Sequence, residues 1–324
     1  MGGMKWFLLL AATALLCSWL GVPQHALGQS VGPDRPLKVL IIDGNNPYHD
    51  WQATTPLLKK ILEDSGRFEV DVATLPMEQL PPGEAMRELT SGAPGARAGS
   101  PQTAGFRPTF SDYDVVVSNY VGPRWPAETE ADFVAFVARG GGFVCVHAAD
   151  NAFPDWTEYN QITGVGGWYG RNEAWGPHVY YVDGELVRDT APGSGGHHGP
   201  QHEYQVRIRD REHPITRGLP ELWMHAKDEL YDSLRGPAER LHVLATAYSA
   251  PEQQGTGHHE PVLMTIDYGR GRVFHTVLGH ADYSMKCVGF ITTLLRGTEW
   301  AATGDVTIPV PDDFPTADQS SSVK

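Results

Sequence analysis

The amino-terminal half of the chain alternates short apolar runs with amphipathic segments. Six segments in succession have the patterns of strand, helix, strand, strand, helix and strand, at residues 38–43, 55–66, 68–72, 114–118, about 128–138 and 143–146. The first helix carries apolar residues on one face, has Pro56 in its first turn and ends at Gly66. This β-α-β-β-α-β order predicts a mostly parallel sheet with right-handed crossovers.

The pattern changes after Asp150. Residues 151–177 are rich in aromatic residues, glycine and asparagine. Four alternating runs then predict antiparallel-looking strands, at residues 204–209, 241–247, 262–267 and 272–277. Turn residues at 268–271 indicate a hairpin between the last two runs, and a closing helix is predicted at about 284–295. The chain as a whole predicts an α/β fold with a mostly parallel sheet and antiparallel additions.

Residues 1–28 have the layout of a signal peptide. Lys5 precedes an apolar run over 6–20, and small residues at Ala26 and Gly28 form a cleavage site. That run is short for a membrane span, and no other stretch of the chain is long and apolar enough for one. We therefore expect an exported soluble protein, periplasmic or extracellular, that has no membrane partner.

The remaining chain is expected to form one domain over residues 37–300. Residues 76–108 are rich in proline, glycine, alanine and serine and are interpreted as a surface insertion, with one short helix around 84–89. The segment 301–324 is rich in proline, aspartate and serine, so it is predicted to be a flexible C-terminal tail.

Charge and composition exclude several classes of function. The chain has 39 acidic and 25 basic residues and a formal charge of −14, which argues against a nucleic-acid partner. Only Cys145 and Cys287 remain after the predicted cleavage, so a disulfide framework is excluded. The loop after the first strand lacks the glycine spacing of a dinucleotide site, and no nucleotide cofactor is expected. A homo-oligomer is left open.

Three histidines occupy equivalent places in the pattern. His49, His147 and His280 each follow an apolar run, at 39–42, 143–146 and 273–278. If these runs are neighbouring parallel strands, the three loops open at the carboxyl edge of the sheet, where α/β proteins bind ligands. Imidazoles that converge there predict an active site or a metal site, and their chemistry suits Zn, Mn or Fe(II).

Further candidates surround these histidines. Asp228 and Glu229 could orient a histidine, ligate a metal or act as a general base, or they could anchor a loop through backbone N–H groups. Asn119 ends a predicted strand and is a candidate for substrate binding. The aromatic segment could form a sugar-stacking wall or a local core, and its substrate-binding candidates are Trp168, Tyr169 and Trp175. The paired histidines at 197–198 are interpreted as solvated.

With these motifs in place, the chain resembles the ThuA (trehalose-utilisation) family. The resemblance rests on the first strand with its histidine loop and on four motifs: GGGFVCVHAA at 140–149, HPITRGLP at 213–220, DELY at 228–231 and TVLGH at 276–280. It implies a fold like that of class I glutamine amidotransferases, a flavodoxin-like three-layer sandwich. In those enzymes a nucleophilic cysteine occupies the turn where this chain has His147, and Cys145 is expected to be buried in the strand. The glutaminase activity is therefore not expected.

The resemblance implies an enzyme, a hydrolase or lyase, that acts on a glucoside or its 3-keto form. A base, either His147 or a carboxylate such as Asp228 or Glu229, would remove the proton next to the ketone. His49, His147 and His280 are the candidate ligands of a divalent metal that would polarise the ketone oxygen. The alternative is a non-catalytic carbohydrate-binding or scaffold protein that uses the aromatic wall, and a cysteine hydrolase is a third hypothesis.

Overall fold

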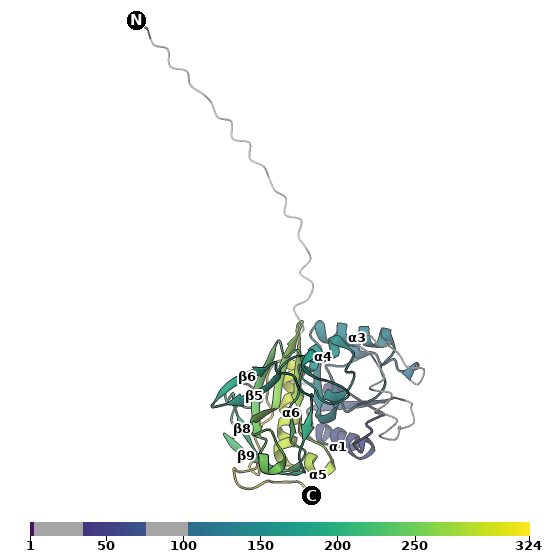
Figure 1. The fold of residues 1–324 in the computed structure, drawn as a ribbon. Coiled ribbons are helices and arrows are strands. Elements are labelled where there is room, and N and C mark those ends of the chain that lie inside the picture. Colours follow the sequence, from purple (N-terminus) through teal and green to yellow (C-terminus); the bar gives the residue numbers. More distant parts are fainter. Residues whose placement is uncertain (3–34, 76–102) are drawn as a thin grey trace. The chain divides into compact units, whose positions relative to one another are not determined.

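The computed structural model describes residues 1–2, 35–75 and 103–324 (Figure 1). Almost all of the predicted signal peptide and most of the predicted insertion, with its short helix at 84–89, lie outside the described residues. Within these limits, no helix is long and apolar enough to cross a membrane.

One eleven-stranded sheet organises the described part of the chain. Five neighbouring strands are parallel, in the order β2 (Phe68–Thr74), β1 (Leu37–Asp43), β3 (Val115–Ser118), β4 (Gly142–Val146) and β13 (Gly271–Thr276). Four more strands continue the sheet in antiparallel order: β12 (His259–Tyr268), β11 (Leu241–Tyr248), β8 (His202–Ile208) and β9 (Leu222–Asp228). The hairpin β5 (His178–Val182) and β6 (Glu185–Asp189) pairs with β12, and β7 (His197–His198) pairs separately with β10 (Tyr231–Asp232).

Helices cover both faces of the parallel strands. In β4, Gly142 lies against Ala301, whereas the ring of the next residue, Phe143, packs on Phe133 and Tyr159. Since consecutive strand residues point to opposite faces, the helix of Ala301 and the helices of Phe133 and Tyr159 lie on opposite sides of the sheet. The helices are α1 (Trp51–Asp64), α3 (Ala127–Ala138), α4 (Thr157–Thr163), α5 (Asp282–Met285) and α6 (Val288–Thr303), with α1 and α5 packed beside α6. Short 3-10 turns are η2 (Phe110–Asp112), η3 (His147–Asn151), η4 (Glu173–Trp175) and η5 (Pro251–Gln253).

The expected mixed α/β sheet is confirmed, and its antiparallel part is larger than the sequence indicated. All four predicted runs are present as β8, β11, β12 and β13, while β5, β6 and β9 are additional. In Figure 1 these added strands lie on the opposite side of the domain from α1 and α3. The strand β13 joins the two parts, because it is parallel to β4 and antiparallel to β12.

The C-terminal part of the chain differs from its prediction in two respects. The closing helix was expected at about 284–295, but the structure has α5 ending at Met285 and a separate helix, α6, from Val288 to Thr303. Gly297 lies within α6 against the Phe274 ring, where a Cβ atom would not fit. The tail 301–324 also makes specific contacts instead of the flexibility expected from its composition. The Phe314 ring lies 5.5 Å from that of Trp223, and Thr316 accepts the Met224 N–H at 2.7 Å.

Candidate metal centre

Four side chains converge at the carboxyl edge of the sheet. His49 lies between β1 and α1, His147 directly after β4, His280 after β13 and Glu229 directly after β9. One donor atom from each residue can be chosen so that all four lie within 4.8 Å of one another. The predicted convergence of the three histidines is therefore present, and a carboxylate joins them.

Glu229 lies among the three imidazoles. Its Oε2 atom is 3.1 Å from His280 Nδ1, 3.5 Å from His147 Nε2 and 3.9 Å from His49 Nε2. His280 Nδ1 is buried and is not oriented for a hydrogen bond, although Glu229 is so near. The arrangement resembles a set of ligands directed toward a shared point more than a hydrogen-bonded network.

The tautomers of two histidines support this interpretation. His147 Nδ1 donates to the carbonyl of Val277 at 2.6 Å, and His49 Nδ1 donates to Asn46 Oδ1 at 2.8 Å. A neutral imidazole then has an unprotonated Nε2 atom, and the two Nε2 atoms lie only 3.1 Å apart. Two lone pairs at that distance repel each other unless a cation, a proton or a metal ion, lies between them. The oxygen acceptors on Nδ1 are the outer contacts that orient metal-binding histidines.

The electrostatics of the cluster also favour a cation. Burial alone would raise the pKa of the Glu229 carboxyl, but the nearby imidazoles of His147, His280 and His49 outweigh burial and hold that pKa well below its usual range. Burial, aided by repulsion from the other two histidines, lowers the pKa of His49 to about 4. Burial alone would lower the pKa of His147, but Glu229 and Asp228 raise it. Glu229 is thus anionic and His49 neutral, which are the forms that ligate a metal.

His147 occupies a strained turn. Its φ angle is +47° and its side chain is buried, at the point where β4 gives way to η3. A left-handed conformation is uncommon for a residue other than glycine and is often found at functional sites. Cys145 lies two residues earlier in the strand, fully buried, and burial raises the pKa of its thiol well above its usual value. This environment is unsuitable for a cysteine nucleophile.

A cavity of about 410 Å³ opens beside the cluster. It is lined by Tyr48, His49, Asn151, Trp168, Tyr169, His198, Glu229 and Tyr231. The Trp168 ring packs at 4.5 Å from the Tyr231 ring, and both Trp168 and Tyr169 have positive φ angles, +54° and +43°. Two of the three aromatic candidates therefore line the cavity next to the candidate metal ligands.

Two substrate-binding candidates, Asn119 and Trp175, lie elsewhere. The Asn119 side chain is buried and donates to Thr54 and Thr55, both at 3.0 Å, so it anchors α1. Trp175 donates from Nε1 to the Pro154 carbonyl and is absent from the lining. A role in substrate binding is not supported for these two side chains, because neither reaches the cavity.

Asp228 is also placed differently from the prediction. It is fully buried, and both of its oxygens accept hydrogen bonds from neighbouring N–H groups, two of them on Gly279 and His280. A general base needs an oxygen that faces the substrate. The prediction of a catalytic Asp228 is therefore not supported, and the loop-anchor alternative describes its contacts.

Sequence reasoning missed two important residues of the cavity. Tyr231 belongs to the DELY motif, and its hydroxyl lies 3.4 Å from His49 Nε2. His198 was interpreted as solvated, but pairing of β7 with β10 sets it opposite Tyr231, with Nε2 3.7 Å from Glu229 Oε1. The motif could have indicated Tyr231. No local signal marked His198, since a two-residue strand depends on its distant partner.

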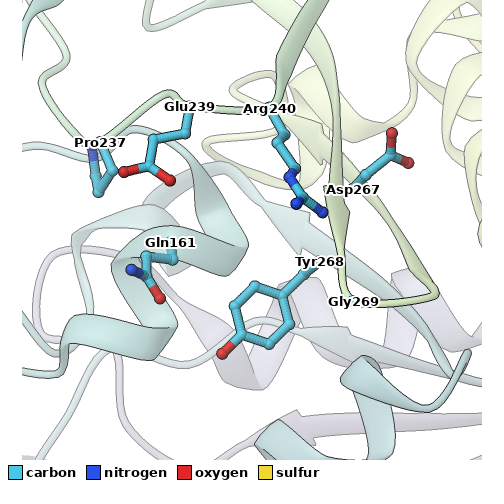
Figure 2. A pocket seen from close by; sticks show the side chains of 7 residues that line it. All are labelled: Gln161, Pro237, Glu239, Arg240, Asp267, Tyr268 and Gly269. Carbon is cyan, nitrogen blue, oxygen red and sulfur yellow. The ribbon is translucent and has the colours of Figure 1, made fainter.

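A second hollow, of about 260 Å³, lies away from this centre (Figure 2). It includes Tyr268 and Gly269 at the hairpin between β12 and β13, which is the opposite end of β13 from His280. The other lining residues shown in Figure 2 are Gln161, Pro237, Glu239, Arg240 and Asp267. None of them was a candidate, and no histidine or cysteine contributes to the lining.

Fold and site together define an α/β protein with a centre of three histidines and one carboxylate at the carboxyl edge of parallel strands. The chain belongs to the ThuA family, described as trehalose utilisation, which matches residues 101–301. A solved ThuA-like protein from Parabacteroides merdae is 48% identical, with a TM-score of 0.80 over 89% of this chain and 98% of the other.

A second ThuA-like structure, from Bacteroides uniformis, shares the fold at lower similarity. It is 17% identical and has a TM-score of 0.52 over 89% of this chain and 97% of the other. A comparison with curated proteins finds no match.

Proposed function

We propose that this chain is an exported, metal-dependent enzyme that acts on a carbohydrate, with glucosides oxidised to a 3-keto form as the substrate class. The observation that carries the proposal is the cluster of His49, His147, Glu229 and His280, which borders a cavity walled by aromatic rings. Flat rings match the apolar face of a pyranose, and family membership supplies the link to sugars. Export rests on the signal-peptide pattern of residues 1–28.

The residues of the cluster fit a divalent transition metal. Three imidazoles and one carboxylate suit Zn, Mn or Fe(II), and the buried, unpartnered His280 Nδ1 has no other evident role. When bound, such a metal would polarise a ketone oxygen of the substrate as a Lewis acid. Both His49 and Glu229 contribute to the cavity lining, so a substrate could approach the centre from that side.

The same cavity provides groups for proton transfer. A ketone acidifies the adjacent C–H, so a base can take that proton while the glycosidic C–O bond breaks and the departing oxygen gains a proton. Glu229 is the member of the predicted base set that lines the cavity, and its Oε1 atom lies toward His198 rather than toward the other histidines. The Trp168 and Tyr169 rings would orient the sugar and exclude water.

We also infer a relationship to the class I glutamine amidotransferase fold, the flavodoxin-like three-layer sandwich. Helices on both faces of the parallel strands support it, as does the strained turn that carries His147 after β4. On this interpretation the turn that presents a cysteine in amidotransferases here presents a metal ligand.

A metal analysis tests the proposal. The metal content of the purified protein is compared with that of the His147→Ala/His280→Ala double variant by elemental analysis. The activity of both proteins is then measured as the release of p-nitrophenol from each anomer of p-nitrophenyl 3-keto-glucopyranoside. A stoichiometric transition metal that disappears in the double variant, together with turnover, would support the proposal. A metal in neither protein would contradict it.

The alternative, a carbohydrate-binding protein without catalysis, is supported by the aromatic wall alone. It predicts sugar binding that Trp168→Ala abolishes and that chelators and the double histidine variant leave unchanged. The Trp175→Phe variant is a matched control, because Trp175 is an aromatic residue of the same segment that does not line the cavity.

A further inference from the structure

Asp228 accepts backbone N–H groups from two of the loops that carry the candidate metal ligands. Its Oδ1 atom accepts the backbone N–H groups of Glu229 at 2.9 Å and His280 at 3.0 Å. Its Oδ2 atom accepts the N–H of Gly279 at 2.7 Å and lies 2.8 Å from His225 Nε2. One carboxylate therefore binds the main chain of two cluster residues that are 51 positions apart in the sequence.

Both members of the Asp228–His225 pair are fully buried. Each has 0% of its side chain exposed, and both lie on β9, at the antiparallel edge of the sheet. Glu229 begins directly where this strand ends, whereas His280 comes from the loop after β13. Because β9 and β13 are separated in the sheet by β12, β11 and β8, strand pairing alone does not set the position of one loop relative to the other.

We propose that Asp228, supported by His225, is a positioning residue that holds Glu229 and His280 at the separation needed to bind a metal ion. This inference rests on the proposed metal centre and adds the element that assembles it. Outer contacts of this kind typically change metal affinity about 10- to 100-fold when they are removed.

The isosteric Asp228→Asn substitution is the sharpest perturbation. An amide has one acceptor oxygen and one donor nitrogen. If the nitrogen takes the Oδ1 position, it opposes the N–H groups of Glu229 and His280; if it takes the Oδ2 position, it opposes the N–H of Gly279. Either orientation sets donor against donor and loosens at least one of the two loops.

His225→Leu is the second test variant, and His275→Leu is its matched control. His275 is also fully buried and lies 3.2 Å from a fully buried carboxylate, Asp150. Its other ring nitrogen donates to the Thr163 carbonyl, so its bonds reach none of the four cluster residues. The two leucine variants each remove one buried imidazole from a carboxylate. Asp150 lies in the η3 turn that begins at His147, but of the two carboxylates only Asp228 accepts backbone N–H groups of cluster residues in the described structure.

Two measurements on the full chain decide the matter. The first is Zn²⁺ affinity, by competition with a chromophoric chelator; the second is backbone hydrogen exchange of Gly279 and His280 in the metal-free protein. We expect Asp228→Asn and His225→Leu to weaken Zn²⁺ binding about 10- to 100-fold and to accelerate exchange at both amides. His275→Leu is expected to change neither, even where it lowers thermal stability.

Unchanged affinity and unchanged exchange in Asp228→Asn would overturn the inference. So would an equal loss of Zn²⁺ affinity in the His275 and His225 variants, because that result indicates general destabilisation. If the wild-type protein binds no Zn²⁺ or other divalent transition metal, the proposed function fails, and exchange in the metal-free variants still shows whether Asp228 holds the two loops.

Discussion

The buried guanidinium of Arg171 offers a severe test of how the cavity wall is built. Only 2% of this residue is exposed, and its side chain donates to the carbonyls of Asn151, Ala152 and Gly167 and to Asn160 Oδ1. No carboxylate accepts from it in the described structure, and burial lowers its pKa to about 10. Arg171 thus connects the chain just before Trp168 to the segment that follows His147.

Arg171→Met retains a long side chain and removes every donor. Three buried carbonyls then lose a partner, at a cost of about 1–3 kcal/mol each. Removing the guanidinium also removes the desolvation cost of a buried charge that has no carboxylate partner, and this gain offsets part of the loss. We expect the free energy of unfolding to fall by roughly 3 kcal/mol, and the strained Trp168 and Tyr169 to lose their fixed positions.

Urea denaturation measures the stability, and acrylamide quenching measures the exposure of Trp168, taken as the difference from a Trp168→Phe background. Arg296→Met is the matched control, because Arg296 is also buried and donates to four carbonyls, at Pro214, Ile215, Arg217 and Ile308. It should cost similar stability without changing the quenching of Trp168. A loss below about 1 kcal/mol in Arg171→Met, or equal quenching changes in both variants, would refute the reasoning.

Three further predictions follow from the structure. The hydrogen bond to Asp228 and the nearby Cys287 thiol outweigh burial and raise the pKa of His225 to about 9. The folded state therefore binds more protons than the unfolded one above pH ~6.5, so urea titrations should show the stability of the metal-free protein falling by up to about 3 kcal/mol as the pH rises through 9, with a smaller slope in His225→Leu. Zn²⁺ at about 100 times its dissociation constant should add about 2.7 kcal/mol to the free energy of unfolding, and the double histidine variant should show no gain. Gly289→Ala places a Cβ atom 2.2 Å from the Trp223 ring and should cost about 1–3 kcal/mol in thermal denaturation, whereas Gly105→Ala, which meets no atom within 4 Å, should be nearly neutral.

Local patterns determined the framework of this protein. The apolar runs before His49, His147 and His280 predicted three buried strands, and the structure shows that all three belong to the parallel part of the sheet, including the run at 272–277 that looked antiparallel in sequence. Parallel pairing was the condition for the three histidines to converge, and once it holds their convergence follows from topology. Asp50, which directly follows His49, caps α1 by accepting the Ala53 N–H, a role typical of aspartate at a helix start.

Only the tertiary structure decided which polar side chains share the centre. Asp228 and Glu229 are adjacent and chemically alike, yet one is enclosed by backbone N–H groups and the other faces the histidines. Consecutive residues at the end of a strand diverge, and which of them meets the site depends on how β9 is placed by β8 and β11. His198 reached the cavity only through the pairing of β7 with β10. Such long-range pairing leaves no periodic trace in the sequence, because it is set by the packing of the whole sheet rather than by the residues of one segment.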